Sequence, residues 1–315
     1  MKSTFEQEVK QSDRFQFTVC TPTYNRVYTL HRVYESLKAQ TYRDFEWLVV
    51  DDGSIDNTRE LVEQWQQIAD FPICYIYQEN AGKHVACNHA VRLAKGELFL
   101  CFDSDNICVP NTLERFKYHW DSISEDEKDK FVGVTALCMD KHGRVLGNPF
   151  PVDAIDSNEI EMQVKCGLAG EKWGFHRIDV LKEFPFPEIQ GEKFLAEGLV
   201  WNRISTKYKT RYVNEKLQVV EYLTDGLTVS SIEIRAKSPK GTRLYYQEYL
   251  SLNVPLTKKF RNLINYIRFS FHAGINPLKI LIESKRRILV VLFMPLGYVF
   301  YIKDVCQVSS DFKLI

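Results

Sequence analysis

The sequence lacks an excess of charge of either sign. Its 315 residues include 41 lysines and arginines and 41 aspartates and glutamates, so the formal net charge at pH 7 is zero. Proteins that bind nucleic acid usually carry a strong basic excess or a basic stripe. We therefore expect no nucleic-acid partner, and any electrostatic function must come from a local group of residues.

The sequence also lacks the patterns that indicate export or a zinc ribbon. None of its eight cysteines forms a C-x-x-C pair, and several lie inside apolar runs, as small buried side chains do. The first residues, MKSTFEQEVKQSDRFQ, include no apolar segment of the kind found in a secretory signal. These absences favour a reducing, cytoplasmic setting. Nothing in the sequence indicates an oligomeric state, and there is no internal repeat.

Hydrophobic residues make up 45% of the chain, which is ample for a core. In the first hundred residues, short runs rich in β-forming residues alternate with amphipathic segments. The expected strands are 15–21, 45–52, 73–79 and 97–103, and the expected helices are 27–40, 56–69 and 83–96. This order predicts βαβ units, and therefore an α/β fold with a Rossmann-like, mostly parallel sheet and helices on both faces. Later in the chain we expect a strand over 131–140, a helix over 191–208, and strands over 210–215 and 217–223.

All four early strands end on polar residues: TPTYNR, DDGS, QENAGK and DSDN follow them in that order. Ligands of open α/β sheets bind beyond the carboxyl ends of the strands, so we expect the binding site there. Tyr24 can stack on a nucleotide base, Arg26 can pair with phosphate, and Lys83 begins a helix, where anions are favoured. Asp52 can accept hydrogen bonds from a ribose or a base, although an ordinary turn would account for it equally well.

Two carboxylates, Asp103 and Asp105, close the fourth expected strand with only Ser104 between them. Like charges this close repel each other unless a cation joins them, and carboxylate oxygens suit Mg²⁺ or Mn²⁺. Two carboxylates leave the rest of the coordination shell to water and substrate phosphates. The alternative is an aspartate-rich turn, since this short pattern occurs by chance in many chains.

The character of the sequence changes beyond about residue 240. A basic flank at 285–287 precedes a fifteen-residue apolar stretch, 288–302, which contains Pro295 and Gly297. A spanning helix needs about 20 apolar residues, so we expect an interfacial or re-entrant membrane anchor, with a helix packed on the domain as the alternative. We therefore divide the chain at residue 235, with a helical C-terminal region over 236–315.

Four stretches together resemble the inverting glycosyltransferases of family 2, of the bacterial polysaccharide type, which have the GT-A fold. They are TVCTPTYNR, TYRDFEWLVVDDGSIDNT, ENAGKHVACNHAVRLAKGELFLCFDSDN and GEKFLAEGLVWNRI, in family order over roughly residues 15–225. The resemblance implies a GT-A catalytic domain over 1–235, a nucleotide-sugar donor (commonly a UDP-sugar), and a Mn²⁺ or Mg²⁺ cofactor. With the C-terminal segment, it also implies a saccharide or polyprenyl-linked acceptor at the inner face of the cell membrane, in surface polysaccharide biosynthesis.

By the same resemblance, four residues lie at the nucleotide end of the donor: Pro22, Tyr24, Asp52 and Lys83. Asp103 would lie near the ribose and the metal, and Asp105 would be the chief metal ligand. Ser104 stands where some members of the family carry a second acid.

The acceptor hydroxyl needs a general base on the face opposite the leaving group. The family often supplies it from a Glu-Asp pair that opens a helix. The matching stretch here is AEGLVW, in which Glu197 is present and Gly198 stands where the aspartate would be. We predict Glu197 as the base, with Glu192 as the second choice.

Two other functions fit parts of the pattern. A sugar nucleotidyltransferase would share the nucleotide-binding half, but it usually has a glycine-rich, lysine-containing loop after the first strand, which TPTYNRVYTL does not offer. A non-catalytic, membrane-associated nucleotide-sugar binder would share the donor site without needing the base.

Overall fold

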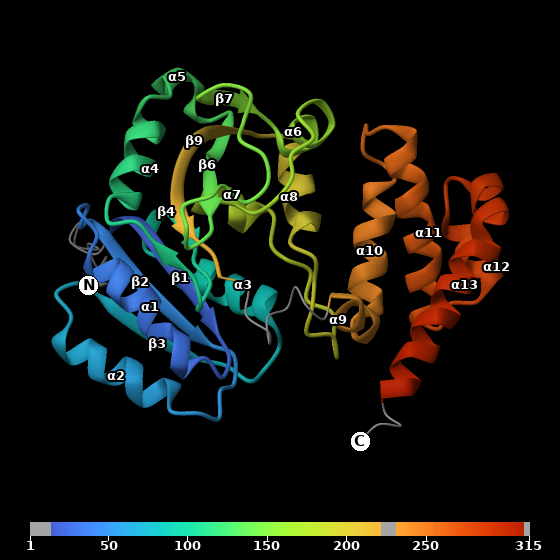
Figure 1. Ribbon diagram of the computed structural model, residues 1–315, viewed down its shortest axis with the longest axis horizontal. Coiled ribbons are helices and arrows are strands. Elements are labelled where there is room, and N and C mark those ends of the chain that lie inside the picture. The colour runs from blue at the N-terminus through green and yellow to red at the C-terminus, as the bar shows by residue number, and fades with distance from the viewer. Residues whose placement is uncertain (1–13, 222–230, 312–315) are drawn as a thin grey trace, which may run out of the picture.

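The structure, a computed structural model, describes residues 14–221 and 231–311. A central sheet with helices on both faces is followed by a group of helices at the carboxyl end (Figure 1). The expectation about a secretory signal rests on residues 1–16, of which the first thirteen lie outside the described part. The last two residues of the expected strand 217–223 also lie outside it.

In the described part of the chain, nine strands form one sheet in the order β3-β2-β1-β4-β8-β6-β9-β5, with β7 paired to β9. Their bounds are β1 Phe15–Thr23, β2 Phe45–Asp51, β3 Ile73–Tyr77, β4 Gly96–Cys101, β5 Ile107–Cys108, β6 Phe131–Met139, β7 Ala154–Ser157, β8 Lys172–Arg177 and β9 Lys209–Val219. Strands β1 to β4 run parallel to one another, as the alternating sequence predicts. Strand β8 is antiparallel to β4 and β6, and β5 and β7 are antiparallel to β9, so the parallel arrangement holds mainly for the first half.

Thirteen helices lie in the described residues. They are α1 Val27–Lys38, α2 Thr58–Ile68, α3 Lys83–Leu93, α4 Thr112–Asp121, α5 Glu125–Lys128, α6 Glu159–Lys165, α7 Ile178–Glu183, α8 Gly198–Ser205, α9 Ser231–Lys237, α10 Pro239–Tyr249, α11 Leu256–His272, α12 Pro277–Glu283 and α13 Arg287–Asp311. Helices α1, α2 and α4 pack in one apolar core, and α3, α7 and α8 pack in a second. Side chains alternate across a strand, so β1 supplies Val19 to the first core and Cys20 to the second. The sheet is thus covered on both faces.

Two expected segments differ from the structure. The helix expected over 191–208 begins only at Gly198, because residues 191–197 follow an irregular path between α3 and α10. Local periodicity cannot reveal that path, since the contacts that fix it are distant in sequence. The two strands expected over 210–215 and 217–223 form the single strand β9, which bends through shifts in its register with β6.

The C-terminal helices have an apolar cluster of their own, which includes Leu263, Ile267 and Val290. A Cβ at Gly297 would lie 2.5 Å from Cγ2 of Ile267, so α13 approaches α11 closely only because this position is glycine. Helix α10 joins this group to the sheet domain, because Arg203 of α8 forms a two-pronged ion pair with Glu248 of α10 at 2.6 and 2.8 Å. The expected division at residue 235 falls inside α9.

Helix α13 is longer than the fifteen-residue apolar stretch suggested. Its residues Arg287–Gln307 form the one candidate span in the described residues that is long and apolar enough to cross a membrane, and only 17% of the stretch is buried. The expectation that the segment is too short to span is therefore wrong on length. A re-entrant segment would show a break in the helix. Helix α13 shows none, because it continues through Pro295.

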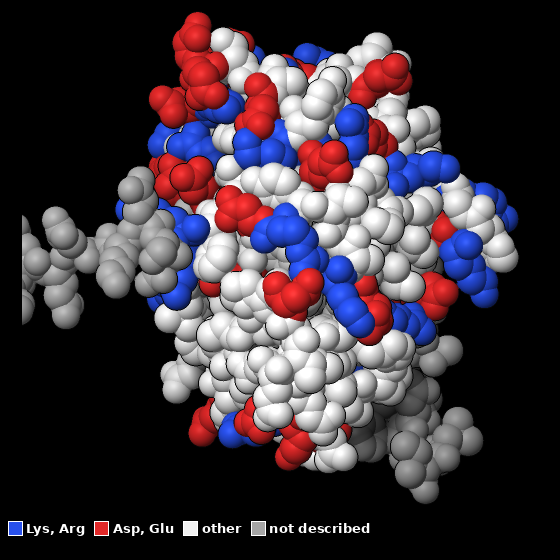
Figure 2. All heavy atoms as spheres, turned by 90° about the vertical axis from the view of Figure 1, so that its left-hand side faces the viewer, with Lys and Arg blue, Asp and Glu red and all other residues white. Residues whose placement is uncertain are grey.

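Charges on the side of the molecule opposite the C-terminal helices agree with the balanced composition. Figure 2 shows acidic and basic side chains next to one another over the upper part of this face, with no separate patch of either sign. This face offers no basic stripe for a phosphate backbone.

Candidate active site

The loops after β1 and β2 are tied to each other at the carboxyl edge of the sheet. The Oδ1 atom of Asn25 accepts a hydrogen bond from the Ile55 backbone N–H (2.9 Å), and the Asn25 N–H donates to Ser54 Oγ (2.8 Å). Asn25 has a positive φ of 52°, which asparagine tolerates better than most residues. Asp56 accepts a hydrogen bond from the Val27 N–H (3.1 Å). This bond links the first residue of α1 to a residue just before α2.

The carboxylate of Asp52 fixes the next loop. It accepts hydrogen bonds from Gln78 Nε2 and from the backbone N–H groups of Ala81 and Gly82, all at 2.8 Å. Asp52 is buried, and three donors from the protein take most of the accepting capacity of a carboxylate. In this structure its side chain shapes the path into α3.

Helix α3 begins at Lys83 directly after a strained glycine. Gly82 has a φ of +99°, and a Cβ there would lie 2.0 Å from the carbonyl oxygen of Lys193. Only glycine therefore lets the 191–197 segment lie against the start of α3. This close approach brings the second half of the chain to the edge of the parallel strands.

Lys83 joins two carboxylates that are 94 positions apart in the chain. Its Nζ lies 2.6 Å from Oδ1 of Asp103 and 2.8 Å from Oε1 of Glu197. Burial opposes the lysine charge, but the two carboxylates outweigh it and raise the pKa of Lys83 well above its usual value. The predicted base and the first acid of the D-x-D stretch therefore lie in one site, within reach of one ammonium group.

The D-x-D stretch forms a turn beyond β4, which ends at Cys101, two residues before the expected end. The Asn106 N–H donates to the carbonyl of Asp103 (3.2 Å), and Arg32 of α1 donates to the carbonyl of Asp105 (3.3 Å). Ser104 between the two acids is buried. Burial raises the pKa of Asp105, and the charge of Asp103 raises it further. The two carboxylates therefore repel each other when both are ionised.

This donor set fits a divalent cation that takes most of its ligands from elsewhere. Among the described residues, no group of three or more His, Cys, Asp or Glu side chains could hold a metal. Asp103 and Asp105 offer two hard carboxylates whose mutual repulsion a cation would relieve. The residues present therefore suit Mg²⁺ or Mn²⁺ bound together with a diphosphate and water, and do not suit a closed protein cage.

The other predicted donor residues lie at the same edge. Pro22 is buried in β1. The Tyr24 side chain is about half exposed (49%), so its ring is free to stack on a flat group. Burial and the charge of Asp103 raise the pKa of Asp105. Arg26 lies close enough for its positive charge to oppose that rise. It also donates to the hydroxyl of Tyr28. The structure thus brings the ends of β1, β2 and β4 and the start of α3 together.

Glu192, the second choice for the base, is engaged elsewhere. Its carboxylate accepts the backbone N–H groups of Lys240 and Gly241, both at 2.7 Å, in the first turn of α10. It is buried, and the positive end of a helix is a favourable place for a negative charge. Glu192 therefore fastens α10 to the 191–197 segment, and no described contact connects it to Lys83 or Asp103.

Replacing Glu192 with glutamine should weaken the fold and leave the chemistry intact. The amide keeps the volume but loses charge-assisted bonds, so we expect the free energy of unfolding to fall by about 1–3 kcal/mol in urea titrations. The kcat should stay within about threefold of wild type. Glu125→Gln, at a mostly exposed side chain, serves as the control. A collapse of kcat at unchanged stability would restore Glu192 as the base.

Sequence reasoning missed one carboxylate in this region. Glu171 stands just before β8, and its pKa is raised first by burial and then by the charges of Asp103 and Glu197. Glu171 reaches the site because β8 pairs with β4, which brings residues 171–177 to this edge of the sheet. The sequence carries no periodic or motif signal for it.

Comparisons with known proteins agree with this geometry. The model named Glycosyl transferase family 2 matches residues 18–144. An uncharacterised glycosyltransferase of Rickettsia typhi is 34% identical over 231 residues, which are 66% of this chain and 70% of that protein. An uncharacterised glycosyltransferase of Nostoc sp. is 37% identical over 100 residues, which are 32% of this chain and only 31% of that protein.

Solved structures show the same fold. TarS from S. aureus in complex with UDP-GlcNAc superposes with a TM-score of 0.58 at 20% identity, over 86% of this chain and 76% of that one. The mannosyltransferase PcManGT from Pyrobaculum calidifontis, in complex with GDP-Man and Mn²⁺, gives 0.55 at 16% identity, over 92% and 88%. Taken with the family match and the relative from R. typhi, they show that the chain belongs to glycosyl transferase family 2 and is a glycosyltransferase with the GT-A fold.

Proposed function

We propose that the chain transfers a sugar from a UDP-sugar to a saccharide acceptor, with inversion at the anomeric carbon and with a divalent cation. The observation that carries the proposal is the bridge from Asp103 through Lys83 to Glu197, at 2.6 and 2.8 Å. The bridge joins Asp103, a proposed metal ligand at the end of β4, to Glu197, the proposed base from the second half of the chain. The proposed transfer uses both, the first beside the leaving diphosphate and the second beside the attacking acceptor hydroxyl.

In this proposal the donor lies along the carboxyl edge of the parallel strands. Tyr24 stacks on the base, Pro22 and Asp52 shape the base pocket, and Arg26 and Lys83 face the diphosphate. The exposed ring of Tyr24 and the raised pKa of Lys83, which keeps its ammonium charged, support these roles. TarS and PcManGT bind a UDP-sugar and a GDP-sugar, which supports a nucleotide-sugar donor here.

Asp105 would be the chief ligand of a Mn²⁺ or Mg²⁺ ion and Asp103 the second, with Ser104 buried between them. When bound, the cation would supply Lewis-acid stabilisation of the charge that develops on the leaving diphosphate. Arg32, which holds the Asp105 carbonyl, positions the turn for this purpose. The Mn²⁺ in the PcManGT complex supports the choice of ion.

Glu197 would take the proton of the attacking acceptor hydroxyl. It occupies the N-cap position of α8, its side chain is 43% exposed, and Gly198 follows it, so the single carboxylate is open to an acceptor. The reaction is one displacement: the acceptor oxygen forms a bond to the anomeric carbon as the diphosphate oxygen leaves, and the proton goes to Glu197. One displacement inverts the configuration without a covalent enzyme intermediate.

The C-terminal region would hold the enzyme at the inner face of the cell membrane, where a polyprenyl-linked acceptor for surface polysaccharide is presented. Helix α13 exposes a row of large apolar side chains to solvent: Ile288, Val291, Leu292, Leu296, Val299 and Ile302. Apolar side chains this exposed would be stabilised by burial in the apolar part of a membrane. The basic residues at 285–287 suit the anionic headgroups beside it. This assigns catalysis to residues 1–235 and membrane association to 236–315, with α10 linking the two.

A donor screen tests the proposal. UDP-, GDP- and dTDP-sugars are compared by thermal shift and by slow hydrolysis, with and without Mn²⁺. We expect a UDP-sugar with Mn²⁺ at about 100 times its Kd to raise the Tm by several degrees, since binding then adds about 2.7 kcal/mol. No response to any of the donors would overturn the proposal.

A further inference from the structure

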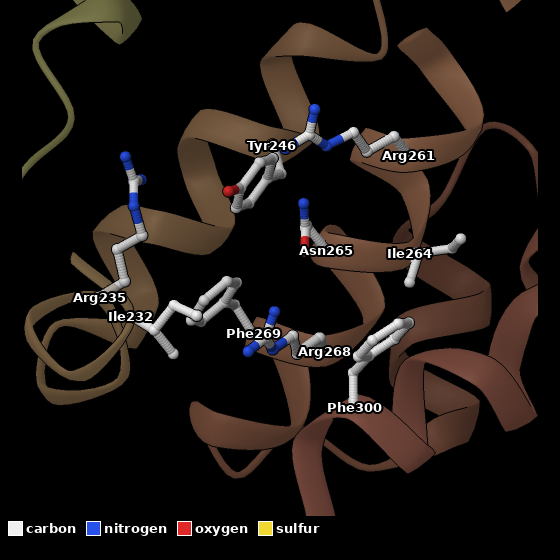
Figure 3. Close-up of a pocket in the computed structure, with 9 residues that line it drawn as sticks. All are labelled: Ile232, Arg235, Tyr246, Arg261, Ile264, Asn265, Arg268, Phe269 and Phe300. Atoms are coloured by element: carbon white, nitrogen blue, oxygen red, sulfur yellow. The ribbon is translucent and has the colours of Figure 1, made fainter. Parts of the chain in front are cut away.

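A second hollow, away from the strand ends, lies among the C-terminal helices. It has a volume of about 670 Å³ and is lined by α9, α10, α11 and α13 (Figure 3). Three arginines, Arg235, Arg261 and Arg268, and the rings of Phe269 and Phe300 line it, and no carboxylate is among the lining residues. An arginine-lined, aromatic-walled hollow without a carboxylate suits an anion attached to an apolar group.

The arginines of this hollow differ in how their charge is compensated. Arg268 is held by Asp304 of α13 and lies over the rings of Phe269 (5.3 Å) and Phe300 (5.6 Å). Arg261 has no carboxylate partner among residues 14–221 and 231–311. The Nη1 atom of Arg235 is buried with no hydrogen-bond partner in that same part of the chain. A buried guanidinium donor without an acceptor is costly, so an acceptor supplied by a ligand would stabilise this donor.

The hollow adjoins the segment that carries the proposed base. The guanidinium of Arg235 lies 5.2 Å from the centre of the Phe194 ring, and the Phe194 N–H donates to Ser238 Oγ at 3.1 Å. A second hollow of about 300 Å³ shares Arg235 and Arg261 with the first and reaches Gln163 of α6. The two hollows therefore form a groove from α13 towards the sheet domain, and Glu197 lies three residues beyond Phe194.

The other end of the groove opens on the apolar helix. Phe300 of α13 lines the hollow, and the exposed apolar side chains of the same helix continue from it. We infer that this groove binds the phosphate group of a lipid-linked acceptor, with the arginines on the phosphate and the lipid chain along α13. The inference rests on the proposed function, because it names the acceptor class for that same transfer. Arg235, which lines both hollows, contacts Phe194 of the segment that carries Glu197, and this favours an acceptor over a bulk phospholipid.

The test measures binding of lipids to the full chain in neutral detergent micelles by calorimetry. The probes are a polyprenyl phosphate, the matching polyprenol, phosphatidic acid and inorganic phosphate. The variant R235Q/R261Q removes two charges from the groove, and K240Q/K279Q removes two from exposed positions outside it. Urea unfolding of both variants shows whether they fold as the wild type does.

We expect the wild type and K240Q/K279Q to bind polyprenyl phosphate at least about tenfold more tightly than the other three probes, and R235Q/R261Q to lose that preference. Equal binding by R235Q/R261Q would overturn the inference, and so would phosphatidic acid binding as tightly as polyprenyl phosphate. If R235Q/R261Q is unfolded, the single variant R261Q, at an exposed side chain, decides the same question. Titration of UDP with Mn²⁺ into the same proteins separates a failure of the groove from a failure of the proposed transfer.

Discussion

Asp105→Asn is expected to lower kcat/KM for sugar transfer about a thousandfold, the size of effect seen when one electrostatic partner of a transition state is removed. The amide keeps the shape of the side chain but weakens the hold on a divalent cation, so charge on the leaving diphosphate goes uncompensated. Steady-state kinetics with a UDP-sugar and saturating Mn²⁺ measure the loss. If the Asp105→Asn enzyme kept the wild-type kcat/KM, Asp105 would not be a metal ligand that the reaction needs.

Stability separates this loss from unfolding. Burial and the charge of Asp103 raise the pKa of Asp105 in the folded protein, so its ionised form destabilises the fold at neutral pH and this cost disappears as pH falls. The uncharged asparagine should therefore leave the metal-free protein at least as stable as the wild type. Asp129→Asn, at a side chain that is 99% exposed, serves as the matched control and should leave kinetics unchanged.

Glu197→Gln is expected to lower kcat by about 10²- to 10⁴-fold, the usual contribution of a positioned general base. The glutamine cannot take the proton from the acceptor hydroxyl, whereas the donor should bind much as before. The measurement is single-turnover transfer from a bound UDP-sugar, which separates chemistry from binding.

The matched control for this variant is Glu192→Gln, five residues earlier, which should keep its kcat. Substitution of Glu197 also frees Lys83 from one of its two carboxylates and leaves it paired with Asp103. Unchanged turnover in Glu197→Gln would move the base elsewhere, with Glu171 as the next carboxylate to test.

The first half of the fold, and the strand ends at which we propose that the nucleotide binds, follow from local sequence. Apolar runs that end on Thr21, Asp52 and Asp103 predicted parallel strands whose polar ends share one edge, because βαβ units place them there. The strand boundaries differ by only a few residues. Local pattern was sufficient here because each strand and helix shows its own periodicity.

The acceptor half could not be predicted in the same way. The path of 191–197 depends on Gly82 meeting the Lys193 carbonyl and on Glu192 meeting the first turn of α10, two contacts that are distant in sequence. Glu171 reaches the site only through the antiparallel pairing of β8 with β4. The arginine groove arises because α9, α11 and α13 meet, although their residues are spread over positions 232–300.

The central claim is that Asp105 serves the donor and Glu197 serves the acceptor within one site. Calorimetric titration of UDP into the wild type, Asp105→Asn and Glu197→Gln, with and without Mn²⁺, tests it most directly. We predict Mn²⁺-dependent binding that Glu197→Gln retains and Asp105→Asn loses. Binding of UDP that is equally tight in all three proteins, or that ignores Mn²⁺, would contradict the claim.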